Sequence, residues 1–267
     1  MKWTQEAEKA IKKVPFFVRK KVRARVEKEA SAEGKNRITL DEVKATRKRF
    51  LTNMDSEVKG WQIDTCFSSG ECPKRAVSGE RLLKKIEALL NESDMLAFLK
   101  AHVNGKLKFH HDFRIGLSEC PNACSQPQIK DFGIIGACSP LLTDEQCSCC
   151  EACVDVCKEN AIQLDYEQEK PLIDFNLCLK CRQCIKVCPT GTLIDGEKGF
   201  RIQLGGKLGR HPQLARELPG VFSEAETLKI IKDCITFYKQ NSKQGQRFAV
   251  IFKADDFEAL AKNLQQL

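Results

Sequence analysis

Residues 113–137 read FRIGLSECPNACSQPQIKDFGIIGA, and the rest of the chain is organised around them. The residues from Phe113 to Leu117 alternate between apolar and polar or small, which is typical of a half-buried strand. The apolar run from Phe132 to Ile135 predicts a second strand. Two cysteines stand in the loop between them, and Pro121 stiffens that loop because its ring fixes a backbone dihedral.

Four cysteines form the first candidate metal site. Cys120 and Cys124 flank Pro-Asn-Ala, and upstream Cys66 and Cys72 flank five residues. Four thiolates are what a cubane iron–sulfur cluster requires. A structural zinc site is the alternative, but cysteine pairs that bind zinc usually stand two to four residues apart. The five-residue spacing therefore favours the cluster.

Two further cysteine runs have the C-x2-C-x2-C-x3-C spacing of a bacterial ferredoxin. In such pairs the fourth cysteine of each run binds the other cluster. The expected ligands are Cys147, Cys150, Cys153 and Cys188 for one cluster, and Cys178, Cys181, Cys184 and Cys157 for the other. Two short strand-like pieces, Ala161–Leu164 and Pro171–Phe175, lie between the runs. Three cysteines remain unassigned and are interpreted as bystander thiols: Cys138, Cys149 and Cys234. Cys149 crowds the first run, so the choice of ligand there stays open.

Composition limits the possible classes of protein. The chain has 267 residues and 15 cysteines, whose spacing matches cluster ligands rather than a disulfide framework, so we expect a reducing compartment. No stretch approaches the roughly 18–20 continuous apolar residues of a membrane span. The N-terminus has no apolar signal core. We therefore expect a cytoplasmic protein with no membrane contact.

The N-terminal residues, 1–53, are predicted to form a small helical domain. Thr4 is a candidate N-cap, Pro15 suits the first turn of a second helix, and Thr39 to Glu42 is a capping box for a third. Residues 1–50 carry a net charge of +9, whereas the whole chain carries +8. Because no base-stacking aromatics interleave with the basic residues, we expect no nucleic-acid partner.

This segment, from Trp3 through Val14-Pro-Phe-Phe-Val-Arg19 to Thr39, resembles the small helical domain at the C-terminus of the B polypeptide of light-independent protochlorophyllide reductase. The resemblance implies that the module covers or delivers a tetrapyrrole that carries carboxylates. A packing or dimerisation module with a solvated basic face is the alternative.

The C-x5-C pair followed by Cys-Pro-Asn-x-Cys resembles the pattern by which sulfite and nitrite reductases hold a 4Fe-4S cluster beside sirohaem. The resemblance implies that Cys124 bridges the cluster and the sirohaem iron. The loop from Gly205 to His211 is similar to the Gly-Gly loop of dissimilatory-type sulfite reductases, where basic groups meet sirohaem carboxylates.

The expected fold is therefore α+β. The domains are a helical domain (1–53), a reductase domain in two parts (60–140 and 196–267) and a ferredoxin insert (141–195). In the second reductase part, a capping box from Ser223 to Glu226 opens a helix, and Arg247–Phe252 is expected to be an edge strand.

Basic residues near these loops are the candidates for binding the substrate and the cofactor. The substrate candidates are Lys74, Arg75, Arg114 and Lys130, and the candidates for sirohaem carboxylates are Lys106, Lys108, Lys207 and Arg210. The sequence alone does not divide these roles.

The predicted function is reduction of sulfite to sulfide, with three 4Fe-4S clusters, sirohaem and a low-potential electron donor protein. Reduction of nitrite to ammonia is one alternative, and a non-catalytic electron-transfer or tetrapyrrole-binding protein is another. The sequence shows one reductase repeat where that family has two, so we expect a homodimer that completes the pocket. The N-terminal module would supply charge to the pocket through Arg19, Lys20, Arg23 and Arg25.

Overall fold

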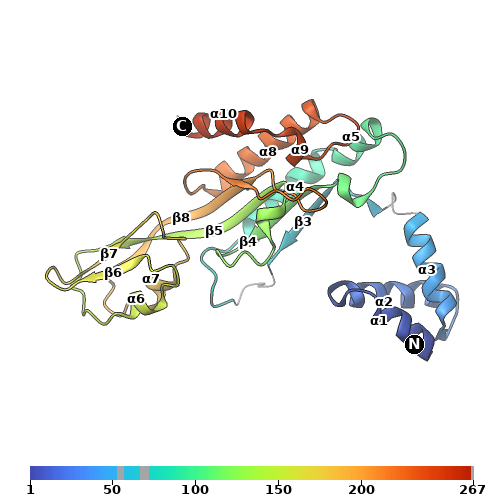
Figure 1. Ribbon diagram of the computed structural model, residues 1–267, viewed down its shortest axis with the longest axis horizontal. Helices are drawn as coiled ribbons and strands as arrows, with labels where there is room; N and C mark the ends of the chain where they lie inside the picture. The colour runs from blue at the N-terminus through green and yellow to red at the C-terminus, as the bar shows by residue number, and fades with distance from the viewer. Residues whose placement is uncertain (53–56, 67–71, 266–267) are drawn as a thin grey trace. The chain divides into compact units, whose positions relative to one another are not determined.

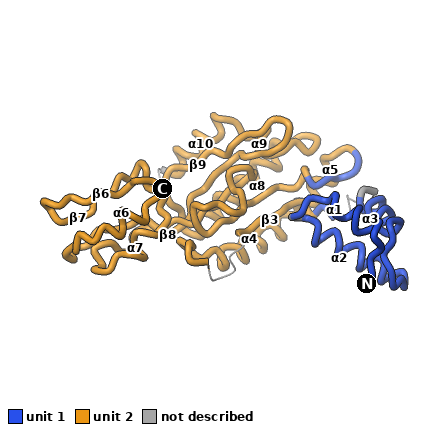
Figure 2. The backbone as a smooth tube through the Cα atoms, turned by 60° about the horizontal axis from the view of Figure 1, so that its bottom comes forward, with its two compact units in different colours: residues 1–58, 105–109 blue, residues 59–104, 110–267 orange. Residues whose placement is uncertain are grey.

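The computed structural model describes residues 1–52, 57–66 and 72–265, which form two compact units (Figures 1 and 2). Unit 1 comprises residues 1–58 and 105–109, and unit 2 comprises residues 59–104 and 110–267. The chain is α+β, as the sequence predicts. The boundaries of the three predicted domains, one of which is in two parts, stay predictions.

Unit 1 is a small helical module. Its elements are β1 (Lys2–Trp3), α1 (Gln5–Lys12), α2 (Phe16–Ala32), β2 (Arg37–Ile38) and α3 (Leu40–Thr52). The predicted caps are confirmed: the Thr4 side chain accepts the Ala7 N–H, and Glu42 accepts the Thr39 N–H at 2.7 Å. A hydrophobic core cluster of the module is formed by Ala7, Val26, Ala30 and Ile38.

Unit 2 is built on a five-stranded sheet with the order β3-β4-β5-β8-β9. The strands are β3 (Trp61–Thr65), β4 (Phe113–Ser118), β5 (Phe132–Leu142), β8 (Leu193–Leu204) and β9 (Arg216–Glu217). The first three are parallel to one another, and β8 is antiparallel to β5. The two strands that residues 113–137 predict are therefore confirmed as β4 and β5.

Helices complete the reductase part of unit 2. They are α4 (Glu80–Glu92), α5 (Met95–His102), α8 (Glu224–Asn241), α9 (Phe248–Ile251) and α10 (Ala254–Gln265), with the short 3-10 helices η2 (Phe109–His111, across the unit boundary) and η3 (Pro127–Ile129). The predicted capping box is present at the start of α8, where Ser223 and Glu226 bond reciprocally. Buried side chains of α4 and α8 include Leu82, Ile86 and Ile230, so these helices supply much of the core.

One predicted element is wrong. Residues Phe248–Ile251 form helix α9 instead of the expected edge strand. The helix buries the consecutive residues Phe248 and Ala249, which an alternating strand would place on opposite faces. It also stacks the Phe248 ring on the Phe252 ring, with centroids 4.7 Å apart. Packing against neighbouring side chains therefore overrides the strand-like composition of this segment.

Strands β5 and β8 extend from the sheet as a long antiparallel pair. The small cysteine-rich part, which connects the two strands, lies at the far end of this pair (Figure 1). That part contains α6 (Ala152–Val156), β6 (Ile162–Asp165), β7 (Lys170–Ile173) and α7 (Gln183–Val187). Strands β6 and β7 pair antiparallel, as predicted for the hairpin between the two cysteine runs. We call residues 141–195 the insert, although its first and last residues belong to β5 and β8.

Candidate functional site

The cysteine loop lies at the carboxyl end of parallel strands. Cys66 follows β3, Cys120 follows shortly after β4, and these two strands are neighbours in the sheet. The Cys66 N–H donates to the Leu117 carbonyl at 3.0 Å, which continues the strand pairing up to the cysteine. Parallel neighbours end at one edge of a sheet, so the topology itself brings the two cysteine pairs together.

The four cysteines of this site influence one another electrostatically. Burial raises the pKa of the Cys120 thiol, and the nearby thiols of Cys72, Cys124 and Cys66 raise it further. Cys124 is exposed, whereas the other three are partly buried. The structure thus brings the predicted quartet together, although the five residues between Cys66 and Cys72 lie outside the described ranges.

Two serines close the base of the cysteine loop. The hydroxyls of Ser118 and Ser125 are 2.7 Å apart, and the Ser125 N–H donates to the Ser118 Oγ at 3.1 Å. Inside the loop, the Asn122 amide donates to the Cys124 Sγ at 3.0 Å. Sequence reasoning missed both serines, because nothing in a Ser-x6-Ser spacing predicts such a contact. Their bonds fix the loop that presents Cys120 and Cys124.

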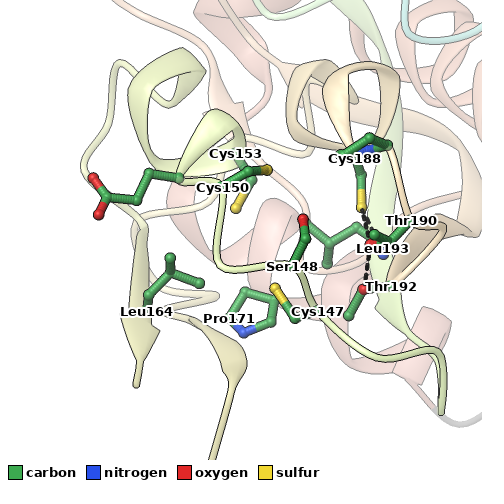
Figure 3. A pocket seen from close by; sticks show the side chains of 12 residues that line it. Cys147, Ser148, Cys150, Cys153, Leu164, Pro171, Cys188, Thr190, Thr192 and Leu193 are labelled. Carbon is green, nitrogen blue, oxygen red and sulfur yellow. Dashed lines mark hydrogen bonds between the residues drawn. The ribbon is translucent and has the colours of Figure 1, made fainter.

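The first predicted ferredoxin quartet lines one small cavity. Figure 3 shows the side chains of Cys147, Cys150, Cys153 and Cys188 around it, although Cys188 comes from the second run. Burial alone raises the pKa of a thiol, but the Leu193 N–H, at 3.4 Å, and the Thr190 hydroxyl lower the pKa of Cys188 below its ordinary value. A lowered pKa favours the thiolate form of Cys188, which is the form that a metal ligand requires.

The second predicted ferredoxin quartet lines another cavity, of about 430 Å³. Its walls include Cys157, Cys178, Cys181 and Cys184, and Cys157 comes from the first run. Burial, followed by the neighbouring Cys181 and Cys178 thiols, raises the pKa of Cys184 to about 12. The same cavity is lined by Cys120, Pro121 and Asn122. The second quartet and the cysteine loop at the sheet edge therefore share one cavity.

Backbone N–H groups point at four of the cysteine sulfurs, two in each run. Each distance is 3.4 Å, and the pairs are Cys149 to Cys147, Ala161 to Cys157, Lys180 to Cys178 and Leu193 to Cys188. Hydrogen bonds of this kind tune clusters held by cysteine. The crossed quartets and these donors fit a pair of 4Fe-4S clusters. Within the described residues, no three His, Cys, Asp or Glu side chains form a group suited to a single metal ion.

Cys149 has a backbone role. It adopts φ 51°, as Lys180 adopts φ 57° at the matching position of the second run. In both places this left-handed turn directs an N–H at the cysteine two residues earlier. Cys149 is not among the described residues that line the first cavity. The crowding in the sequence therefore need not displace a ligand.

The predicted basic residues are spread over several places. Lys130 is ion-paired with Asp64 and its side chain is 11% exposed. Burial opposes ionisation of Asp64, but Lys130, Gln62 and Arg114 together lower the pKa of Asp64. Lys130 and Arg114 are thus brought together around one carboxylate beside the cysteine loop.

The other candidates are less concentrated. The Lys74 ammonium lies 3.5 Å from the Gln183 Oε1 in the insert, and Arg75 follows it. Lys207 is bonded to Gln213 through its backbone, and Arg210 is exposed. Lys106 and Lys108 belong to unit 1, whereas the cysteine loop belongs to unit 2.

The glycine loop after β8 packs closely against the segment that follows the cysteines. A Cβ on Gly206 would lie 2.5 Å from the Gln128 carbonyl oxygen and 2.7 Å from that of Lys130. The Gly205 N–H donates to the Asp131 carbonyl at 2.9 Å. The structure therefore brings the predicted Gly-Gly loop next to Lys130.

Asp131 and Arg247 are a further pair that sequence reasoning missed. Asp131 is 1% exposed, and its carboxylate accepts the Arg114 N–H at 3.0 Å and faces the Arg247 guanidinium at 3.5 Å. Burial raises the pKa of Asp131, and Arg247 opposes that shift. This pair links the residue before β5 to the N-terminus of α9, and Asp131 also bonds to the backbone of β4 through Arg114.

Comparison with known families agrees with this geometry. Residues 58–266 match the family described as the nitrite and sulphite reductase 4Fe-4S domain. The chain belongs to this family. Residues 3–47 match the family described as the proto-chlorophyllide reductase 57 kD subunit, so both predicted resemblances are confirmed.

Individual relatives of this reductase family are longer than the chain. The coenzyme F420-dependent sulfite reductase of Methanocaldococcus jannaschii is 31% identical over 59% of the chain and 25% of its own length. The beta chain of the dissimilatory-type sulfite reductase of Archaeoglobus fulgidus is 29% identical over 50% of the chain and 40% of its own length. The chain thus spans well under two thirds of these relatives.

A solved structure shares the fold. The crystal structure of dissimilatory sulfite reductase I matches 84% of the chain and 57% of its own, with a TM-score of 0.52 and 15% identity. At this identity the match supports the fold alone. None of the described helices combines the length and the apolar character needed to cross a membrane.

Proposed function

We propose that the chain is a sirohaem- and 4Fe-4S-dependent reductase that converts sulfite to sulfide, and that electrons reach its site through the insert. The observation that carries the proposal is the cavity shared by the cysteine loop and the second ferredoxin quartet. An electron-transfer centre has to lie near the centre that it reduces. The arrangement therefore supports a route from the insert to the cysteine loop.

Three clusters would use twelve of the fifteen cysteines. The quartet at the sheet edge would hold one, with Cys124 as the thiolate shared with the sirohaem iron, and the crossed quartets of the insert would hold two. When bound, these groups supply the stored electrons and the metal that binds the anion. Cys124 suits the shared position because it is the exposed member of its quartet.

The protein's own task is to hold an anion beside that metal and to shield its charge. Lys130 and Arg114 are our first candidates for contacting the anion, because Lys130 is ion-paired with Asp64 and the charge of Arg114 also lowers the pKa of that carboxyl. Lys74 and Arg75 remain candidates for the same role, and Lys106, Lys108, Lys207 and Arg210 for the sirohaem carboxylates. Cations that face oxyanions in this way stabilise developing negative charge.

Sulfite is preferred over nitrite because both of the long curated relatives described above are sulfite reductases. A low-potential donor protein would reduce the insert, and a homodimer remains our expectation for assembly. The alternative function, an electron-transfer or tetrapyrrole-binding protein without catalysis, is favoured by the short span of the chain relative to those enzymes.

Anaerobically purified holoprotein tests the proposal directly. We expect about twelve irons per chain from three four-iron clusters, a sirohaem absorption band, and faster turnover of sulfite than of nitrite with a low-potential donor. Cys124→Ser should lose sirohaem while it keeps the eight irons of the insert, and Cys149→Ser is the matched control that should keep both groups. Sirohaem bound without turnover of either anion would favour the non-catalytic alternative. About eight irons with no sirohaem would exclude the reductase.

A further inference from the structure

Lys186 joins the insert to the loop that follows Cys72. It lies on α7, between the predicted ligands Cys184 and Cys188. Its ammonium donates to the carbonyl oxygens of Pro73 at 2.7 Å and of Arg75 at 2.8 Å. These acceptors are one and three residues beyond Cys72. The contact therefore runs from one predicted cluster-binding segment to another, more than 110 residues away in the chain.

The ammonium of Lys186 lies beside the segment that carries Cys72. Its acceptor Pro73 directly follows Cys72 in the chain, so the positive charge stands close to that predicted ligand. Lys186 remains exposed overall, so salt should weaken its influence. Its two bonds are charge-assisted, however, and such bonds are the stronger kind.

Other contacts hold the neighbouring part of the insert to strands β5 and β8. The Arg201 guanidinium on β8 donates to the Leu179 carbonyl at 3.2 Å, and the Cys138 N–H on β5 donates to the Lys180 carbonyl at 2.8 Å. These bonds hold the ligand loop that precedes α7. They do not reach the Cys72 loop, and Lys186 makes two bonds that do.

We propose that Lys186 is a positioning residue that clamps α7 onto the Cys72 loop and, through its positive charge, favours the reduced form of the centre held by Cys66, Cys72, Cys120 and Cys124. The inference rests on the proposed function, since it assumes a redox centre at that quartet. A nearby cation stabilises the additional negative charge of a reduced cluster, because net charge around a cluster sets its potential. A lysine suits this role, since its compact ammonium can meet two carbonyls.

The test uses the holoprotein and three variants. Lys186→Met keeps the apolar stem but removes the donors and the charge, and Lys186→Arg keeps donors and charge. Lys170→Met is the matched control, because Lys170 is an exposed lysine of the same insert on β7. Hydrogen exchange is read at residues 75–77, whose N–H groups bond to the Cys72 and Glu119 carbonyls. Redox titration followed by electron paramagnetic resonance measures the reduction potential of the centre held by Cys66, Cys72, Cys120 and Cys124.

For Lys186→Met we expect exchange at residues 75–77 to rise about fivefold, the scale of one lost hydrogen bond to a charged group at an exposed site. At the potential where the wild-type centre is half reduced, the ratio of reduced to oxidised centre should fall about threefold, and a tenfold change would equal 59 mV for one electron. Both effects should shrink in high salt. Lys186→Arg and Lys170→Met should stay close to wild type.

Unchanged exchange or an unchanged potential in Lys186→Met would overturn the proposal, as would equal shifts in Lys170→Met or in Lys186→Arg. Failure of the proposed function looks different. In that case the wild-type protein itself would hold about eight irons and show no signal from a third four-iron cluster.

Discussion

Replacing Gly133 by alanine should displace the segment Pro127–Ile129, which directly follows the cysteine loop. Gly133 on β5 pairs with Gly116 on β4, and the segment Pro127–Ile129 crosses directly over both. A Cβ on Gly133 would lie 2.6 Å from the Pro127 carbonyl oxygen and 2.9 Å from its Cβ. Real Cβ atoms essentially never approach other atoms this closely, so something must move.

The crossing segment has little room to move. Ordinary contact begins near 3.4 Å, so Pro127 would have to shift by about 0.8 Å, an overpacking strain. Gly206 already packs against the next residue of the segment, since a Cβ added to it would lie 2.5 Å from the Gln128 carbonyl oxygen. The Ala215 N–H also holds that carbonyl at 2.8 Å. We therefore expect a cost near the top of the usual overpacking range, about 3 kcal/mol.

Urea unfolding of the holoprotein checks this magnitude. With a slope of about 1–3 kcal/mol per molar, a loss of about 3 kcal/mol moves the midpoint by about 1 M or more. Gly79→Ala is the matched control, because the nearest atoms to its new Cβ all belong to the Leu117 side chain, whose flexible Cδ2 end lies 2.6 Å away. A Gly133→Ala midpoint no lower than that of Gly79→Ala would refute the reasoning.

Three further predictions concern other parts of the site. Cys147→Ser should lose about four irons of one cluster, whereas Cys149→Ser should lose none, as iron analysis will show. Ser125→Ala removes the bond between the Ser118 and Ser125 hydroxyls, and should cost about 1 kcal/mol in unfolding and speed loss of iron to a chelator. Arg182 lowers the pKa of Asp195 well below its usual range, so the stabilisation that Asp195 provides is complete above about pH 4 and is lost only as pH falls further. Asp195→Asn should therefore lower the urea midpoint by a constant amount between pH 8 and pH 5. If the difference from the wild type shrinks within this window, the pKa of Asp195 is not lowered.

Local signals in the sequence predicted the fold where the cause of structure is local. The capping contacts of Thr4, Thr39 and Ser223 each join residues three positions apart, so their spacing alone reveals them. The alternation after Phe113 likewise predicts β4. The prediction of a strand at Phe248 was wrong because an apolar run of this length fits either a strand or a buried helix. Only packing against distant aromatic rings decides between the two.

The candidate site divides in the same way. Cysteine spacing was sufficient to predict which thiols gather, including the crossing of Cys157 and Cys188 between the runs. The groups that position those thiols had no such signal. Lys186 bonds to Arg75, and Asp131 faces Arg247, across more than 100 residues in each pair. Contacts of this kind depend on the sheet topology, which one sequence does not reveal.

The arginines of unit 1 change the role expected of that module. Arg19 donates to the Lys12 and Val14 carbonyls, each at 2.9 Å, and so satisfies groups at the end of α1. Arg23 pairs with Glu8 and lies 4.4 Å from the Trp3 ring, while Arg25 pairs with Glu57 and lies over the Phe50 ring.

These three side chains therefore hold the module together, and using them for a tetrapyrrole carboxylate would break bonds already made. Lys20 has an exposed side chain, as do Lys12, Lys13, Lys21 and Lys28. Exposed lysines can meet an anion without losing a partner in the module's core. If unit 1 contributes charge to a tetrapyrrole, the physical argument favours these lysines over the arginines that its sequence made prominent.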